Sequence, residues 1–147
     1  RSGVPECMRE RVRWVRWVER RRGAKMTKVP LSLSGHDLDV RDSRRWVSFE
    51  EARRSKVGTG FGIVLGGGLG CIDLDHCIVD GVVAEWAQGW IDGYRDDAVL
   101  IERSFSGEGV HIFLPMEEGP GRRIRDGVQN VEIYSRERYM AVTGDRL

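Results

Sequence analysis

The stretch CIDLDHC, residues 71–77, constrains the fold most because it combines the pattern of a buried strand with two like charges. Successive side chains of a β-strand point to opposite faces, so Asp73 and Asp75 share one face and their apolar neighbours share the other. The two aspartates would lie roughly 6.6 Å apart along the strand. A DxD pattern alone more often marks an exposed strand or turn, so a cation site here depends on the other strands.

Two further strands carry polar residues opposite apolar ones. In VEIY, Glu132 alternates with Val131 and Ile133, and in GVHIFL, His111 alternates with valine and isoleucine. If the apolar residues share one core, Asp73, Asp75, Glu132 and His111 share the opposite face. Crowded carboxylates raise each other's pKa, and a divalent cation removes that conflict. Oxygen ligands suit Mg²⁺ or Mn²⁺, and two such ions about 3.5–4 Å apart assist displacement at phosphorus.

The rest of the chain predicts an α+β fold with a mainly antiparallel sheet and few helices, which pack on one face. A hairpin is expected around Gly23, with Pro30 confining its second strand to an edge or an end. Ser48 and Glu51 form a capping box for a short helix, and an amphipathic stripe over 83–94 predicts another. The remaining expected strands are FGIVL, CIDLD, AVLIERS, GVHIFLP, GVQNVEIY and YMAVT, of which the first two are joined by GGGLG.

The turn SGEGVH, residues 106–111, has two interpretations. Gly107 and Gly109 allow backbone N–H groups and the Ser106 hydroxyl to face an anion, and His111 could donate to the same triphosphate. Glycine-rich hairpin turns are common, and taken alone this sequence favours a plain turn.

Other nucleotide or metal motifs fit less well. The glycine run of residues 58–70 lacks the GxGxxG spacing and leads into strands, which excludes a Rossmann site, and no Walker A lysine pattern is present. Zinc bound by Cys71, His76 and Cys77 is a weak alternative because a fourth ligand is missing.

The net charge of +1 hides a basic N-terminal segment. Residues 1–28 hold ten Arg or Lys against three Glu, whereas residues 29–147 hold fourteen against twenty acidic residues. Such a segment, with Trp14 and Trp17, could follow a phosphate backbone and stack on bases, or it could be a solvated hairpin with two core tryptophans. The candidate nucleic-acid-binding residues are Arg16, Arg20, Arg21, Arg22, Lys25 and Lys28.

The order of TKVP, SFEEA, GIVLGGGLGCIDLDHC, SFSGEGVHIFLP and VEIYSRERYMAVTG resembles the prim-pol domain of the archaeo-eukaryotic primase superfamily, in particular the bifunctional primase/polymerase domains of phage and plasmid replication proteins. The resemblance covers the chain from about Val12, which implies an extension or cloning remnant over 1–11 and one catalytic domain with an RRM-like core over 12–147. Relatives usually continue beyond the point where TGDRL ends, into a helical domain and a helicase.

By resemblance, Asp73 and Asp75 are the first metal-binding motif and Glu132 completes the site for Mg²⁺ or Mn²⁺. Nucleotide-binding positions are Ser106, Gly107, Gly109, His111 and, more loosely, Arg138. The implied reaction is template-directed transfer of a nucleotide from an NTP or dNTP to a 3′-hydroxyl on single-stranded or primed DNA, with release of pyrophosphate.

Alternatives are a metal-dependent phosphodiesterase or nuclease and a non-catalytic nucleic-acid-binding module. The turn SGEGVH, as a candidate triphosphate-binding turn, argues against a nuclease, because a nuclease does not need to bind pyrophosphate. The 147 residues fit one domain with no membrane span and no CxxC pair, so we expect a monomeric cytoplasmic protein, in a bacterial host if phage-encoded.

Overall fold

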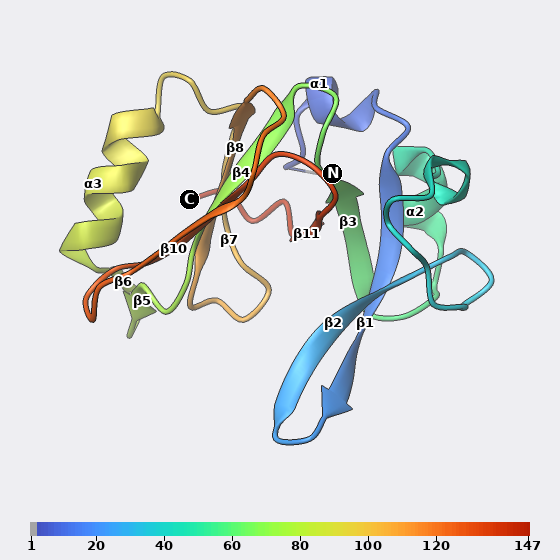
Figure 1. Cartoon of the computed structure of the whole chain (residues 1–147), viewed down its shortest axis with the longest axis horizontal. Coiled ribbons are helices and arrows are strands. Elements are labelled where there is room, and N and C mark those ends of the chain that lie inside the picture. The colour runs from blue at the N-terminus through green and yellow to red at the C-terminus, as the bar shows by residue number, and fades with distance from the viewer. Residues whose placement is uncertain (1–2) are drawn as a thin grey trace. The chain divides into compact units, whose positions relative to one another are not determined.

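The structure is a computed structural model that describes residues 3–147, and it divides into two compact units. The first unit comprises Leu65–Arg136 and Thr143–Leu147 with the described part of residues 1–5, and the second comprises Glu6–Val64 and Glu137–Val142. Both units combine antiparallel sheets with few helices, which confirms the predicted α+β class (Figure 1). The single catalytic domain expected over 12–147 stays a prediction, and the expected extension over 1–11 lies partly outside the described residues.

The first unit contains a five-stranded antiparallel sheet in the order β7-β8-β4-β10-β9. The small hairpin β5-β6 and the helix α3 follow β4 in the chain. The bounds are β4 Leu69–Leu74, β5 Ile78–Val79, β6 Val82–Val83, α3 Glu85–Tyr94, β7 Leu100–Arg103, β8 Val110–Pro115, β9 Arg122–Arg125 and β10 Asn130–Tyr134.

One face of this sheet packs against α3 (Figure 1). Ile72 and Leu74 of β4 and Ile112 of β8 join Ala87 and Ile91 of the helix in one buried cluster. The apolar stripe predicted over 83–94 is therefore the core-facing side of α3, which starts two residues later than the stripe. Because α3 covers the apolar face, the polar residues of the same strands lie on the other face.

The second unit contains a four-stranded antiparallel sheet in the order β11-β3-β1-β2. The bounds are α1 Glu6–Arg9, β1 Trp14–Arg22, β2 Lys25–Leu31, α2 Phe49–Arg54, β3 Gly60–Val64, β11 Tyr139–Val142 and a 3₁₀ turn Ser43–Arg45. The hairpin around Gly23 is confirmed, and Pro30 lies in the edge strand β2. The capping box of Ser48 and Glu51 is present at the start of α2.

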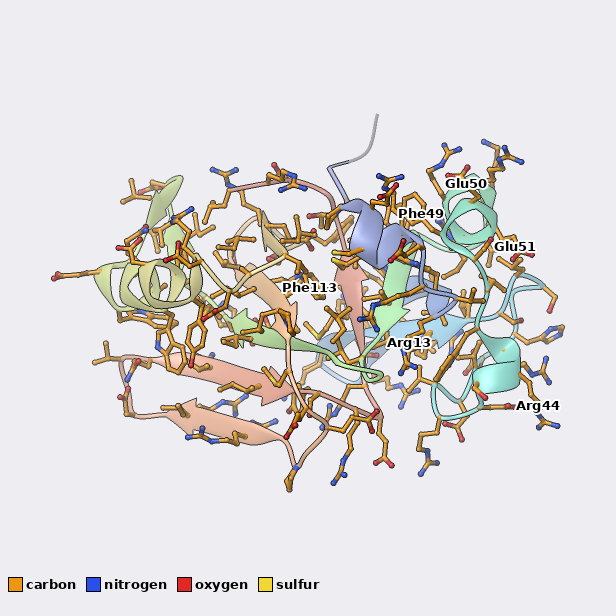
Figure 2. The ribbon with its side chains drawn as sticks, turned by 90° about the horizontal axis from the view of Figure 1, so that it is seen from above. Arg13, Arg44, Phe49, Glu50, Glu51 and Phe113 are labelled. Carbon is orange, nitrogen blue, oxygen red and sulfur yellow. The ribbon has the colours of Figure 1, made fainter. Side chains whose placement is uncertain are left out.

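The core of the second unit is aromatic. Trp14, Phe49 and Phe61 contact one another edge to face, with ring centroids 4.9–5.7 Å apart. Phe49 comes from α2, whose next residues Glu50 and Glu51 are exposed (Figure 2). The ring of Phe49, in the first turn of α2, thus packs the helix against the sheet.

The glycine run between β3 and β4 connects the two units. Gly66, Gly67 and Gly68 all have positive φ, as expected for a tight connection. β3 pairs with β1 and β11, whereas β4 pairs with β8 and β10, so the consecutive strands belong to different sheets. None of the helices described within residues 3–147 is both long and apolar enough to cross a membrane.

Candidate functional site

A row of polar residues crosses the five-stranded sheet of the first unit at one level. Asp73 on β4 lies directly opposite His111 on β8 and Glu132 on β10, its two neighbouring strands. Residues opposite each other in a sheet share a face. The prediction that Asp73, His111 and Glu132 lie on the face opposite the apolar core is therefore confirmed. The row continues outward to Glu102 on β7 and to Arg123 on β9.

Asp75 lies just beyond the end of β4. Its backbone N–H donates to the carbonyl oxygen of Asn130, at 3.0 Å. It follows Asp73 by two residues and lies outside the regular part of the strand, but its charge is close enough to His111 to help raise the pKa of that residue.

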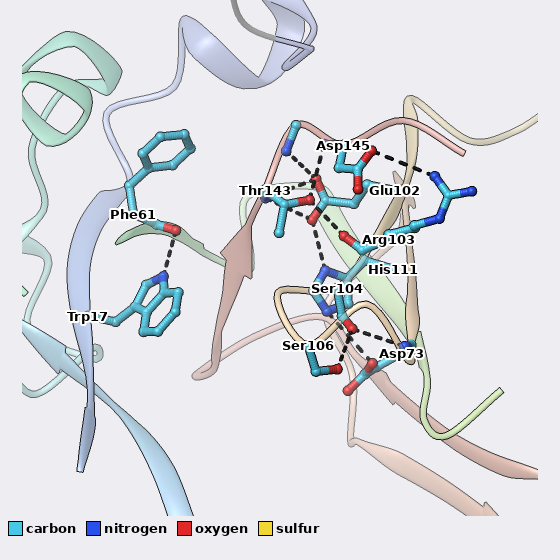
Figure 3. Close-up of polar contacts among 12 residues, drawn as sticks. Trp17, Phe61, Asp73, Glu102, Arg103, Ser104, Ser106, His111, Thr143 and Asp145 are labelled. Carbon is cyan, nitrogen blue, oxygen red and sulfur yellow. Dashed lines mark hydrogen bonds and ion pairs between the residues drawn. The ribbon is translucent and has the colours of Figure 1, made fainter. Parts of the chain in front are cut away.

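His111 is buried and has acidic residues on both sides (Figure 3). Its Nδ1 lies 2.9 Å from Glu102 Oε2, and its Nε2 lies 3.8 Å from Asp73 Oδ1. Burial by itself lowers the pKa of His111, but the hydrogen bond with Glu102 and the charges of Asp73, Glu102 and Asp75 outweigh burial and raise it. The protonated imidazole is thus favoured between the two carboxylates.

Glu102 is the site residue that sequence reasoning missed. Its side chain is fully buried, and its carboxylate also accepts hydrogen bonds from the backbone N–H groups of Thr143 and Gly144 (Figure 3). The sequence signal was weak, because LIER does not alternate as VEIY does: the apolar Leu100 lies on the same face as Glu102. The carboxylate fixes the His111 ring and ties the segment after β11 to β7.

The side chain of Glu132 interacts with the edge of the sheet. Its Oε2 lies 3.3 Å from Nη2 of Arg125 and 3.6 Å from Nη2 of Arg123. The hydroxyl of Tyr134 donates to its Oε1, at 3.0 Å. Glu132 therefore lies beside Asp73 in register, while arginines and a tyrosine satisfy its carboxylate.

The turn SGEGVH forms the connection between β7 and β8, and it is hydrogen-bonded internally. The Gly107 N–H donates to the Ser104 carbonyl, the Glu108 N–H to Ser106 Oγ, and the Gly109 N–H to Ser104 Oγ. Gly107 has a φ of +80°, and a Cβ on Gly109 would lie 2.9 Å from the Leu74 carbonyl oxygen. Both glycines are therefore needed for the turn itself, as its plainer interpretation expects.

A cavity of about 380 Å³ opens beside this turn. The residues that line it come from the segment after β4, from the β5-β6 hairpin and from the turn: His76, Ile78, Val79, Asp80, Gly81, Gly107 and Glu108. Gly107 is the residue that the cavity shares with the predicted nucleotide-binding set.

The predicted nucleic-acid-binding residues lie in the second unit and differ in exposure. Arg20, Arg21, Arg22, Lys25 and Lys28 are exposed on the β1-β2 hairpin. Arg20 forms a bidentate ion pair with Asp37, in which Nη1 lies 2.9 Å from Oδ2 and Nη2 lies 3.1 Å from Oδ1. The exposed group at the hairpin tip is therefore Arg21, Arg22 and Lys25.

Arg16 and the two tryptophans are structural. Arg16 is 6% exposed, and its guanidinium donates to the carbonyl oxygens of Val57 and Ala52, at 2.7 and 3.0 Å. Trp14 and Trp17 are buried, and Trp17 Nε1 donates to the Phe61 carbonyl oxygen (Figure 3). The core interpretation of both tryptophans is correct, and Arg16 does not belong to an exposed binding surface. Arg138 is exposed between β10 and β11 and also belongs to the second unit.

The three carboxylates fit a divalent cation by donor type, and Asp73 and Glu132 also by register, although none fits by its present side-chain contacts. Oxygen donors from Asp73, Asp75 and Glu132 suit Mg²⁺ or Mn²⁺. Within residues 3–147, no group of three or more His, Cys, Asp or Glu side chains is arranged to hold a metal ion, and no buried side-chain nitrogen or oxygen lacks a hydrogen-bond partner. Glu132 would therefore have to exchange its arginine contacts for the cation.

The weaker zinc alternative has no support from the geometry. Cys77 lies in the core cluster against α3. Cys71 lies on the opposite face of the sheet, which it shares with Asp73, and the His76 side chain is largely exposed.

No protein-family model matches the sequence, and no curated protein is significantly similar to it.

Proposed function

We propose that the chain is a DNA primase-polymerase, which transfers a nucleotide from an NTP or dNTP to a 3′-hydroxyl of a primed or single-stranded DNA template with release of pyrophosphate. The observation that supports this most is the direct pairing of Asp73 with both Glu132 and His111 on one sheet face. This pairing brings together two acidic motifs and a histidine that are distant in sequence, as the resemblance to the prim-pol domain requires.

The proposed roles follow from chemistry and position. Asp73, Asp75 and Glu132 would hold the Mg²⁺ or Mn²⁺ ions, which, when bound, lower the pKa of the attacking hydroxyl and neutralise charge on the leaving pyrophosphate. Glu102 holds the His111 ring in place, and the pKa of His111 is raised. His111 would therefore donate a hydrogen bond from Nε2 to a phosphate oxygen. The turn that contains Ser106, Gly107 and Gly109 would approach the triphosphate.

An incorporation assay tests this proposal. The protein is incubated with labelled dNTPs, Mn²⁺ and a primed template, and we expect lengthened primers. Asp73→Ala and Asp75→Ala should each lower incorporation by at least about 100-fold, because the loss of a charge-stabilising ligand costs about 3 kcal/mol of transition-state stabilisation or more.

The matched control is Asp96→Asn, which removes an exposed acid from the turn after α3, the helix that covers the opposite face of the sheet. Its incorporation should stay within about twofold of the unaltered protein, since surface changes away from a site are usually small. A double variant Asp73→Ala/Asp75→Ala that still incorporates nucleotides would reject the metal assignment. Shortened primers would indicate a phosphodiesterase instead.

A second candidate is a nucleic-acid-binding module without catalysis. The contacts of Glu132 with Arg123 and Arg125 favour this candidate, because a carboxylate neutralised by arginines is compatible with a basic binding surface. DNA binding without any incorporation, with the same affinity in the Asp73→Ala variant, would identify this function.

A further inference from the structure

Strand β9, with the sequence RRIR, is a basic edge strand of the five-stranded sheet. Arg123 lies opposite Glu132 of β10, and Arg125 lies opposite Asn130. Because side chains alternate along a strand, Arg123 and Arg125 share the face of the polar row, whereas Arg122 and Ile124 share the other face. Ile124 packs against the cluster that includes α3, which confirms this assignment of faces.

Glu132 orients both guanidinium groups of that face. One carboxylate oxygen contacts a terminal nitrogen of each arginine, at 3.3 Å from Arg125 and 3.6 Å from Arg123. Arg125 is held further by a hydrogen bond from its Nε to Asn130 Oδ1. Glu132 is 16% exposed, whereas the two arginine side chains are 52% and 55% exposed. The cluster therefore presents two fixed cations to solvent and holds one largely buried anion behind them.

This arrangement has the chemistry of an anion site. A guanidinium carries five N–H donors in a planar fork, and Glu132 contacts one terminal nitrogen of each. Phosphate oxygens match this fork and form short, charge-assisted hydrogen bonds with it. Because the carboxylate already orders the arginine side chains, part of the entropy cost of ordering them on binding is avoided.

We propose that Arg123 and Arg125 form a phosphate-binding pair, oriented by Glu132 in the metal-free protein, on the sheet face that carries Asp73. The ligand is a phosphate group, either of a nucleoside triphosphate or of a nucleic-acid backbone. The inference rests on the proposed function for the source of that phosphate. It extends that function to two residues outside the motifs that carry the resemblance.

A simpler explanation is protection of the sheet edge. Charged side chains on an edge strand discourage pairing with another chain, and this would account for all three arginines of β9 equally. Phosphate binding, in contrast, depends on the face of the strand. Arg122 is therefore a matched control, with the same charge on the same strand but on the opposite face.

The experiment compares Arg122→Ala, Arg123→Ala, Arg125→Ala and the double variant Arg123→Ala/Arg125→Ala in the presence of a chelator and without turnover. Binding of inorganic tripolyphosphate is measured by calorimetry. Binding of a fluorescent single-stranded DNA is measured by anisotropy at several salt concentrations. Far-ultraviolet circular dichroism checks the fold, and Arg123→Gln and Arg125→Gln replace the alanine variants if those unfold.

We expect each change on the polar face to weaken tripolyphosphate binding by at least about fivefold, or to lower the slope of log K against log salt for DNA by about 0.7. An effect with tripolyphosphate alone assigns the pair to the nucleotide, and an effect with DNA alone assigns it to the backbone. Losses with Arg122→Ala as large as those of the other two, or no loss with either ligand, would overturn the inference.

Failure of the proposed function gives a different result. Face-dependent phosphate binding by a protein that incorporates no nucleotide would support the phosphate pair and reject the polymerase. Incorporation by a protein whose phosphate binding does not depend on Arg123 or Arg125 would reject the phosphate pair alone.

Discussion

Glu102 and His111 lie opposite each other on β7 and β8, with Oε2 2.9 Å from Nδ1, and both side chains are almost completely buried. Glu102 also accepts hydrogen bonds from two backbone N–H groups of the segment after β11. A buried carboxylate with three hydrogen-bond donors is costly to remove, because the buried imidazole and the two partly buried amides would lose their acceptor. The same carboxylate therefore both stabilises the sheet and fixes the position of the His111 imidazole.

We expect Glu102→Ala to lower the free energy of unfolding by about 3 kcal/mol or more, since it leaves the buried His111 ring and two amides without their acceptor. Glu102→Gln keeps one carbonyl acceptor and should cost less. Urea unfolding measured by tryptophan fluorescence provides both values. Glu117→Ala, which removes an exposed glutamate, should change the free energy by less than about 0.5 kcal/mol. A Glu102→Ala variant as stable as Glu117→Ala would show that the buried pair contributes nothing net.

The raised pKa of His111 predicts a pH dependence of stability with a definite sign. A histidine whose pKa is higher in the folded than in the unfolded state contributes stability that is fully present below its ordinary value of 6.5 and is lost as pH rises through the folded value. The midpoint of urea unfolding of the unaltered protein, in a chelating buffer, should therefore fall from about pH 6.5 upward relative to that of His111→Gln.

The exposed His36 provides the control for this measurement. His36→Gln should keep the pH dependence of the unaltered protein. Identical pH profiles for His111→Gln and the unaltered protein would mean that the imidazole is not held protonated by its acidic neighbours.

Strand alternation made the polar face predictable, because the direction of a side chain depends only on its own strand. The sequence of residues 71–75 places Asp73 opposite the core side, and the same reasoning holds for Glu132 and His111. Which residues lie beside each other was not predictable, since register depends on pairing between distant segments. The contacts that satisfy Glu132 follow from that register.

Strand β9 could not be predicted from its own residues. RRIR contains one apolar residue and has no alternating pattern, so it resembles a charged turn. It is a strand because it pairs with β10 at the sheet edge, which is a tertiary effect. The assignment of Arg16 to a binding surface was wrong for a related reason. The partners of its guanidinium are backbone carbonyl oxygens from a distant part of the chain, which the sequence of the strand does not reveal.

The three cysteines should differ in reactivity with a thiol reagent. Burial raises the pKa of Cys77 to about 11 and that of Cys71 well above its usual range, whereas Cys7 is exposed. The thiolate is the reactive form, so at pH 8 one thiol per native chain should react rapidly and all three after unfolding. Absorbance with Ellman's reagent measures this. Rapid reaction of a second thiol in the native protein would contradict the burial of Cys71 or Cys77.

The basic tip of the β1-β2 hairpin should determine the salt dependence of DNA binding. Each phosphate neutralised on single-stranded DNA contributes about 0.7 to the slope of log K against log salt. Replacement of Arg21, Arg22 and Lys25 by alanine should therefore reduce the slope by about 2, as measured by fluorescence anisotropy. Arg54→Ala, which removes an exposed arginine of α2, should leave the slope unchanged.

Arg16 should behave differently although it belongs to the same strand. Its guanidinium donates to two carbonyl oxygens, so Arg16→Ala should lower the free energy of unfolding by about 2 kcal/mol and leave the salt slope of the folded protein unchanged. A salt slope that does not respond to the three changes at the hairpin tip would remove this hairpin from the DNA-binding surface. A slope that falls with Arg16→Ala would mean that the hairpin opens to expose this residue to DNA.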